Sequence, residues 1–302
     1  MAPSLPDPAL REALQSRLDS ARGLALEAAA LLMDHRADLG HLDVHMKGAV
    51  DLVTAADEAC ERLVLGALAS AFPDDLVIGE EGGGHGPADA PFVWFVDPLD
   101  GTTNFVSGLS HFCVSLGLAL RSPANRLEPV LGVIAAPALV LPGASTPGAL
   151  WSGARSLGAT RQTFASTHTI PLACSPATTL ESALAATGFP YDRQRTAHDL
   201  VRPLEPALER VLCIRRLGSA ALDLAGVADG TFGLYWEPRL KPWDFVAGAA
   251  LVLEAGGRVT DLTGGPGYMD SCNVLASNGR LHDRFLAEVL LPAASPMTGP
   301  AT

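Results

Sequence analysis

Acidic residues that follow or open apolar segments are the part of this sequence best suited to chemistry. Glu80 directly follows the run LVIG, and Asp97 and Asp100 stand three positions apart after the apolar run FVWFV. Asp244 opens a further apolar segment. Clustered carboxylates repel one another, so one of them takes up a proton unless cations compensate the charge. Ligands that are all oxygen, without cysteine or histidine, indicate a hard cation, Mg²⁺ or Mn²⁺.

The stretch WFVDPLDGTTNF, residues 94–105, adds a place for an anion beside the cation. Pro98 fixes φ and removes a competing N–H, so the Leu99 carbonyl can point the same way as the carboxylates on either side. If a helix begins directly afterwards, the amides of Gly101 and Thr102 are free, and such amides bind anions. A cation and a phosphate held side by side are the layout of metal-assisted phosphoryl transfer to water.

Taken singly, these acids also have a simpler interpretation as helix caps and turn residues. Asp is a common N-cap residue, so Asp100 or Asp244 alone favours that interpretation. The set together favours a site, because sites collect at strand ends and helix starts of open sheets. His85 and His111 lie near the acidic motifs, but a hard cation prefers oxygen, so surface or capping roles are favoured for both. Lys47 is equally compatible with a site contact and with a solvated surface position.

The elements that must position these residues follow from the spacing of apolar positions. Apolar residues recur at helical spacing over residues 7–35, and Thr54 with Asp57 forms a pattern typical of the start of a second helix. The continuous apolar run 92–96 predicts a strand covered on both faces. Further strands are expected over 76–78, 112–120, 129–135, 149–159 and 231–237. Further helices are expected over 201–211, 220–228 and 243–257, the last ending at paired glycines.

The chain has 302 residues, enough for one large core or two modest ones. The element order predicts an α/β or α+β protein with two packed halves. We expect residues 1–155 to carry the main metal motifs and residues 156–290 to contribute Asp244 and substrate contacts. Residues 291–302 are expected to form a disordered tail.

Charge and cysteine usage narrow the class of protein. The formal net charge of −12 argues against direct binding to nucleic acid. The five cysteines form no CxxC pair, which indicates reduced thiols and, with no secretory leader visible, a cytoplasmic protein. The uncharged segment 129–154 is broken by prolines and glycines into pieces too short to span a bilayer, so two strands joined by a loop are expected there.

Several motifs now resemble those of one family. Residues 94–105 resemble the first signature of the inositol monophosphatase family, and KPWDFVAGAALVLEAGG, residues 241–257, resembles its second. Matches to further regions of the family follow in the expected order: DLVTAADEACE (51–61), IGEEG (78–82), GFPYD (188–192) and RLGSAALDLAGVADG (216–230). The resemblance covers roughly residues 10–290, and the ordered set is far more specific than a lone DxxDG.

The resemblance implies a layered α/β/α/β/α sandwich of the inositol monophosphatase and fructose-1,6-bisphosphatase type, and Mg²⁺-dependent hydrolysis of phosphate monoesters. It implies that Glu80, Asp97 and the Leu99 carbonyl bind one Mg²⁺. Asp97, Asp100 and Asp244 would bind a second, and Glu80 would help to hold a weaker third. It further implies inhibition by Li⁺ and a homodimer.

The same resemblance assigns the catalytic and substrate-binding residues. Thr102, supported by Asp57, would orient the attacking water together with Glu80. The amides of Gly101 and Thr102 would hold the phosphate. Contacts to the rest of the substrate are expected from Asp100, Gly218, Ser219, Ala220 and Glu237.

Inositol monophosphate is the favoured substrate, because the residues around Glu237 look closer to the inositol group than to other members. Histidinol phosphate, fructose 1,6-bisphosphate and 3′-phosphoadenosine 5′-phosphate remain alternatives. Residues 139–148 are longer than the hairpin typical of the family and residues 155–175 lack its usual turn, which leaves specificity open. A different class of function also stays open, an interaction module for transcription machinery with dispensable catalysis.

Overall fold

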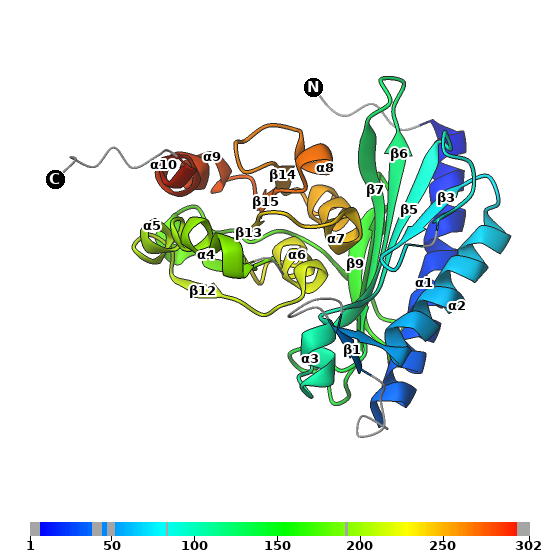
Figure 1. Ribbon diagram of the computed structural model, residues 1–302. Coiled ribbons are helices and arrows are strands. Elements are labelled where there is room, and N and C mark those ends of the chain that lie inside the picture. Colours follow the sequence, from blue (N-terminus) through cyan, green and yellow to red (C-terminus); the bar gives the residue numbers. More distant parts are fainter. Residues whose placement is uncertain (1–6, 38–43, 47–51, 83, 191–192, 295–302) are drawn as a thin grey trace.

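The structure, a computed structural model, describes residues 7–37, 44–46, 52–82, 84–190 and 193–294. Helices and two larger sheets alternate through it in five layers, helix, sheet, helix, sheet and helix (Figure 1). This arrangement confirms the predicted α/β/α/β/α fold. No helix in the described ranges is both long enough and apolar enough to cross a membrane.

The first layer is a pair of helices on one face of the larger sheet. α1 (Pro8–Ala37) and α2 (Ala55–Ala71) pack on each other and on the sheet, as the helical spacing predicts. Buried residues of α1 such as Leu14, Leu18 and Ala21 recur every three or four positions and form one stripe. A two-stranded ribbon, β1 (Val44–Met46) and β2 (Leu52–Thr54), precedes α2.

The second layer is an eight-stranded sheet in the order β10-β9-β8-β7-β6-β5-β3-β4. Only β3 and β5 pair in parallel; the other neighbours are antiparallel. Its strands are β3 (Leu76–Gly79), β4 (Gly84–His85), β5 (Phe92–Asp100), β6 (Cys113–Arg121), β7 (Leu127–Ala136), β8 (Ala149–Ala154), β9 (Gly158–Thr163) and β10 (Ile170–Pro171). The uncharged segment forms β7, β8 and the loop between them, as expected.

The middle layer is formed by α6 (Ala220–Ala228) and α7 (Pro242–Glu254), which pack on each other and on the opposite face of this sheet. Two glycines let α7 lie directly on the strands. A Cβ atom on Gly132 of β7 would overlap the carbonyl oxygen of Ala247, and one on Gly117 of β6 would lie 2.6 Å from the Ala247 nitrogen. α7 therefore sits on the sheet at backbone contact distance.

The fourth layer is a five-stranded sheet in the order β12-β11-β13-β15-β14. Its strands are β11 (Leu184–Thr187), β12 (Cys213–Arg215), β13 (Leu234–Glu237), β14 (Arg258–Thr260) and β15 (Val274–Ser277). Further short helices are η2 (Leu180–Ser182), α4 (Arg193–Val201), α5 (Leu204–Leu208), α8 (Tyr268–Ser271), α9 (His282–Phe285), η3 (Leu286–Leu290) and α10 (Leu291–Ala294).

The outer helices depart from the expectation of one helix over 201–211. α4 ends at Val201, and α5 begins after Pro203 and spans only five residues. Proline has no N–H to donate and its ring clashes with the preceding turn, so α4 ends before Pro203, whereas Pro206 is tolerated in the first turn of α5. The helix expected over 220–228 is present with those bounds.

The chain changes sheets later than the expected boundary at residue 155. β9 and β10 still belong to the eight-stranded sheet, so the change falls after Pro171. The first residues of the expected tail, Leu291–Ala294, form α10, and 295–302 lie outside the described residues. All five cysteines are free thiols, as predicted.

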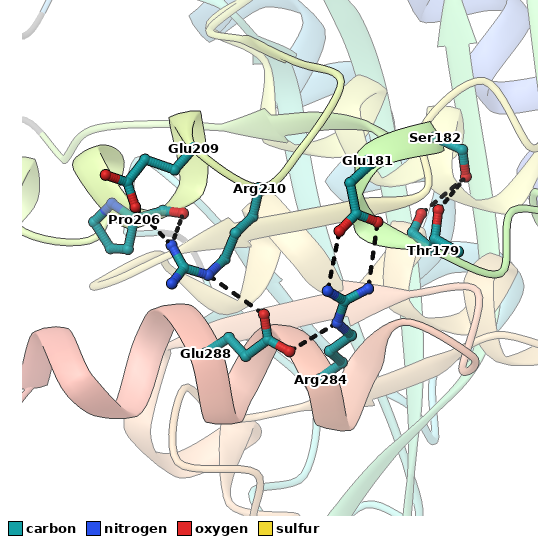
Figure 2. A network of polar contacts seen from close by, with 8 residues as sticks. All are labelled: Thr179, Glu181, Ser182, Pro206, Glu209, Arg210, Arg284 and Glu288. Carbon is teal, nitrogen blue, oxygen red and sulfur yellow. Dashed lines mark hydrogen bonds and ion pairs between the residues drawn. The ribbon is translucent and has the colours of Figure 1, made fainter.

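A network of charged side chains ties the outer elements together (Figure 2). Arg284 donates to Glu181 of η2 and to Glu288 on the next turn of its own helical segment, at 3.0 and 2.7 Å. Glu288 also forms an ion pair with Arg210 at 3.3 Å. These side chains are partly exposed, so water screens the attraction between their charges. The network links η2, the segment after α5 and η3.

Candidate active site

A bulge at the end of β5 positions the two central aspartates. The pairing of β5 with β6 shifts register between Asp97 and Asp100, and the Leu99 N–H donates to Asp97 Oδ1 at 2.9 Å. The strand therefore runs past the expected end at residue 96 and includes both acids. A bulge re-aims the side chains of one strand, so Asp97 and Asp100 share one region instead of alternating between faces.

Gly101 ends the strand and starts α3 (Thr102–Val106), so a helix begins where the sequence predicts it. Its φ is 93°, and a Cβ atom there would lie 2.9 Å from the His111 carbonyl oxygen, so only glycine fits. The Thr102 hydroxyl donates to the Leu99 carbonyl oxygen at 3.0 Å. This bond joins the hydroxyl that the sequence assigns to orienting water, that of Thr102, to the carbonyl that it assigns to a cation, that of Leu99.

Glu80 lies in the turn after β3. Glu61, a residue to which the sequence assigns no role, contacts the main chain of this turn. Glu61 lies on α2 and is 7% exposed. Its Oε2 accepts from the Glu81 amide at 3.0 Å, and it fills the space where a Cβ atom on Gly79 would stand. The main chain on both sides of Glu80 is therefore fixed by a buried carboxylate.

The predicted acids lie close enough together for their charges to change the pKa of Asp97. Burial raises the pKa of Asp97 well above its usual range, and the charges of other acids raise it further. These acids, in order of effect, are Glu80, Asp100, Asp244 and Asp57. The structure thus brings together five carboxylates from α2, the turn after β3, β5 and α7.

Asp244 stands in the first turn of α7, and its Oδ2 accepts from the Lys241 N–H at 2.7 Å. Lys241 is the N-cap residue of α7, and Asp244 is the N3 acid that caps its N–H, so Asp244 has a capping role although it does not occupy the N-cap position that the simpler interpretation of the sequence expects. Burial raises the pKa of Asp244 well above its usual range, followed by the charges of Asp100 and Glu80. The residue is therefore both a cap and a member of the acidic cluster.

Asp100 connects the cluster to α6. Its Oδ2 accepts from the Ser219 hydroxyl at 2.6 Å and from the Ala221 N–H at 2.8 Å. Burial raises the pKa of Asp100, and these two bonds oppose the rise. Ser219 is also the N-cap of α6, and Gly218 before it has a φ of 85°.

Glu237, at the end of β13, lies beside Gly188, where any side chain would overlap its carboxylate. The Tyr235 hydroxyl donates to Glu237 Oε2 at 2.6 Å. Burial raises the pKa of Glu237 to about 8, and the bond from Tyr235 lowers it. Asp100 and Asp223 add to the rise, so Glu237 belongs to the electrostatic surroundings of the cluster.

The donor set fits a hard divalent cation in its chemistry. Its acids are close enough to raise one another's pKa, and cations relieve such repulsion. In the part of the chain that is described, no three His, Cys, Asp or Glu side chains already stand in metal-binding positions. Asp100 and Asp244 each use only Oδ2 in the bonds described above, so the second oxygen of each carboxylate is available to a cation.

Three further residues join the two sides of the site. Asn104, 6% exposed, donates through Nδ2 to the carbonyl oxygens of His111 at 2.7 Å and Leu217 at 2.8 Å. Asp223, 1% exposed, faces His111. The sequence assigns no role to Asn104 or Asp223; a single acid inside the apolar helix AALDLAGVA is the signal that could have identified Asp223. Lys47 lies outside the described residues.

The fold and the acidic cluster together define a layered α/β protein of the inositol monophosphatase fold. The chain belongs to the inositol monophosphatase family, whose model matches residues 13–292.

Relatives with two kinds of name are similar to this chain. Inositol-1-monophosphatase of Synechocystis sp. is 37% identical over 82% of this chain and 78% of its own length. Nus factor SuhB of Salmonella typhimurium (strain LT2) is 36% identical over 82% of this chain and 86% of its own.

Solved structures with each of these two kinds of name are also similar to this chain. Inositol monophosphatase from Anabaena (Nostoc) sp. PCC 7120 is 37% identical with a TM-score of 0.77, over 93% of this chain and 99% of that one. The extragenic suppressor protein suhB from Bartonella henselae is 31% identical with a TM-score of 0.79, over 90% and 98% of the two chains.

Proposed function

We propose that this protein is a phosphoric monoester hydrolase that converts inositol monophosphate to inositol and phosphate with a metal-activated water. Family membership and the relatives named inositol monophosphatase support phosphatase activity. The observation that carries the proposal is the cluster of five carboxylates, of which Asp57, Asp97 and Asp100 are buried and Glu80 and Asp244 are half-buried. Burial raises the pKa of Asp97, and the charges of the other four acids raise it further. Such a cluster is costly to keep without cations.

The proposed metal ligands are those that the sequence predicts. Glu80, Asp97 and the Leu99 carbonyl would hold one Mg²⁺, and Asp97, Asp100 and Asp244 a second. Glu80 would help to hold a weaker third ion, and Mn²⁺ would substitute. Bound divalent cations lower the pKa of water and stabilise a leaving alkoxide.

Groups of the protein itself would orient the water and bind the substrate. Thr102, whose hydroxyl donates to the Leu99 carbonyl oxygen at 3.0 Å, would orient the attacking water together with Glu80 and with support from Asp57. The Gly101 and Thr102 amides at the start of α3 would hold the phosphate. The substrate hydroxyls would meet Glu237, Asp100 and the segment 218–220, which Asp100 already contacts through Ser219.

The direct test is phosphate release from inositol 1-phosphate during a Mg²⁺ titration. We expect activity that rises with Mg²⁺, disappears with a chelator, returns in part with Mn²⁺ and is inhibited by Li⁺. No release under any divalent condition would overturn the proposal. A panel with histidinol phosphate, fructose 1,6-bisphosphate and 3′-phosphoadenosine 5′-phosphate tests the alternative substrates, and a higher kcat/KM for one of them would replace inositol monophosphate.

A second candidate function rests on the relatives named Nus factor SuhB. It is an interaction with the transcription machinery in which catalysis is dispensable. Copurification of RNA polymerase with the wild type and equally with Asp97→Asn would support it. Loss of the copurified polymerase at low salt in both proteins would reject it. A cytoplasmic homodimer without direct nucleic-acid binding remains our expectation for the assembled protein.

A further inference from the structure

A buried carboxylate lies beside the proposed metal ligand Glu80 without belonging to the proposed ligand set. This carboxylate is that of Glu61 on α2, which is 7% exposed and has no part in the proposed mechanism. Burying an acid costs free energy unless its oxygens are hydrogen-bonded or paired. Glu61 Oε2 accepts from the Glu81 N–H at 3.0 Å. The bond therefore holds the main chain one residue past Glu80.

The strand pairing shows why the turn at Glu80 needs a support of this kind. β3 and β5 pair in parallel, and their last pair is Gly79 with Val96. Glu80 and Asp97 follow directly, so the two acids stand next to each other just past the last paired residues. β5 continues its pairing with β6 as far as Asp100, whereas β3 ends at Gly79. The place of Glu80 beside Asp97 thus depends on contacts outside the pairing of β3 with β5.

Glu61 also packs against the residue before Glu80. A Cβ atom on Gly79 would lie 2.6 Å from Glu61 Oε2 and 2.7 Å from its Cδ, and the next nearest atom, Leu65 Cδ1, would be at 3.0 Å. The carboxylate therefore fills the space directly against the Gly79 backbone. One side chain contacts the residues on both sides of Glu80, by packing on one side and by a hydrogen bond on the other.

α2 presents two acids to the site, one turn apart. Asp57 and Glu61 are four residues apart, and residues at this spacing lie on the same face of a helix. Burial is the main cause of the raised pKa of Asp97, and the charge of Asp57 adds to it. Both acids belong to the buried face of α2, whose other members are apolar: Ala56, Cys60, Val64, Leu65 and Leu68. α2 thus places Asp57 near β5 and joins Glu61 to the turn after β3.

We propose that Glu61 is a positioning residue, which holds the main chain at Glu80 so that the Glu80 and Asp97 carboxylates can bind the same cation. This inference rests on the proposed function, in which these two acids share one Mg²⁺. Outer partners of metal-ligating side chains contribute about 10- to 100-fold to metal affinity. Glu61 acts through the main chain, so the lower end of that range is expected.

The test measures the affinity for Mn²⁺, by electron paramagnetic resonance of the free ion, and urea unfolding of the metal-free protein. Glu61→Ala removes the acceptor, and we expect its Mn²⁺ affinity to fall by about 10-fold. Glu61→Gln keeps a side-chain oxygen that can accept from the Glu81 N–H, so it should recover most of this affinity. Binding is measured without urea, where each variant is folded, so a loss of stability alone does not change it.

The double variant Glu61→Ala/Gly79→Ala separates packing from hydrogen bonding. The new methyl group at residue 79 enters the space that the Glu61 carboxylate leaves, while the Glu81 N–H still lacks this acceptor. We expect the urea midpoint to return in part toward that of the wild type and Mn²⁺ affinity to stay low. Recovery of both would mean that Glu61 only fills space, and would overturn the positioning role.

Asp75→Asn is the matched control, because it alters a buried acid just before the opposite end of β3. Asp75 is 2% exposed and accepts from Arg17 at 2.6 and 2.9 Å and from Trp94 at 2.9 Å. The substitution should lower the urea midpoint, because it breaks a buried ion pair, and leave Mn²⁺ affinity unchanged.

Two results would overturn the inference alone: wild-type Mn²⁺ affinity in Glu61→Ala, or an equal loss of affinity in Asp75→Asn. A wild-type protein that binds no Mn²⁺ would overturn the metal assignment of the proposed function and this inference together.

Discussion

Ser219 donates a 2.6 Å hydrogen bond to Asp100, although 119 residues separate the two along the chain. The bond joins the end of β5 to the start of α6, and so joins the eight-stranded sheet to the middle helix layer. The same Ser219 oxygen accepts from the Leu222 N–H as the N-cap of α6. One hydroxyl therefore fixes both a helix start and the orientation of an acidic side chain.

We expect Ser219→Ala to lower the free energy of unfolding by about 1–2 kcal/mol, because a cap and a hydrogen bond to a carboxylate are lost. The bond from Ser219 lowers the pKa of Asp100. Without it, protons compete better with Mg²⁺, and the Mg²⁺ concentration for half-maximal activity should rise. Ser219→Thr keeps the hydroxyl and serves as the control. An unchanged Mg²⁺ requirement in Ser219→Ala would show that this bond does not tune Asp100.

Asp97→Asn should reduce turnover by more than about 100-fold, since loss of residues that only support metal ligands already costs 10- to 100-fold. The same change should raise the thermal midpoint of the metal-free protein, because the charges of four acids oppose ionisation of Asp97. Activity assays and thermal unfolding with a chelator check the two effects separately. Turnover close to that of the wild type would contradict the assignment of Asp97 as a ligand.

The acids of the site are visible in the sequence because each stands in a local pattern. Asp97 and Asp100 follow an apolar strand within a few residues, and Asp244 opens an apolar helix. Glu61 and Asn104 are not visible in this way, because their partners lie on other elements, 20 and 113 residues away for Glu81 and Leu217. Contacts between residues so far apart produce no local pattern in the amino-acid sequence.

In the fold, too, features set by local sequence patterns are predicted, and features that depend on distant partners are not. Helices with a clear apolar stripe and buried strands follow from spacing, as α1 and β5 do. The end of β5 differs from expectation because a bulge, which depends on the partner strand, carries the pairing through to Asp100. The helix expected over 201–211 fails at Pro203, where a local rule about proline outweighs the apolar pattern.

Glu237 should make the ligand-free protein less stable as the pH rises. Its carboxyl has a pKa of about 8 in the folded protein, raised by burial from an ordinary value of 4.5. Below pH 4.5 both states hold the proton. Between 4.5 and about 8 the unfolded chain releases it and the folded protein keeps it, so the free energy of unfolding falls by up to about 1.4 kcal/mol per pH unit.

Glu237→Gln should remove this part of the pH dependence and retain an acceptor for the Tyr235 hydroxyl. The measurement is urea unfolding of the metal-free wild type and variant at several pH values between 5 and 8. The difference between the two proteins should grow with pH, because the other acids titrate in both. Parallel curves would mean that Glu237 is ionised in the folded protein throughout this range.

Gly132→Ala should damage the protein strongly, because a Cβ atom there overlaps the Ala247 carbonyl oxygen of α7. The added methyl group must push α7 off the sheet, and overpacking of this kind costs about 1–3 kcal/mol or more. Since α7 begins two residues before Asp244, we expect activity to fall further than stability explains when both are measured well below the thermal midpoint. Gly23→Ala is the matched control: it lies exposed in the middle of α1 with no atom within 4 Å of the new Cβ, and should stabilise the protein by about 0.5–1 kcal/mol. If Gly132→Ala unfolds at the same urea concentration as the wild type, the close contact between β7 and α7 does not exist in solution.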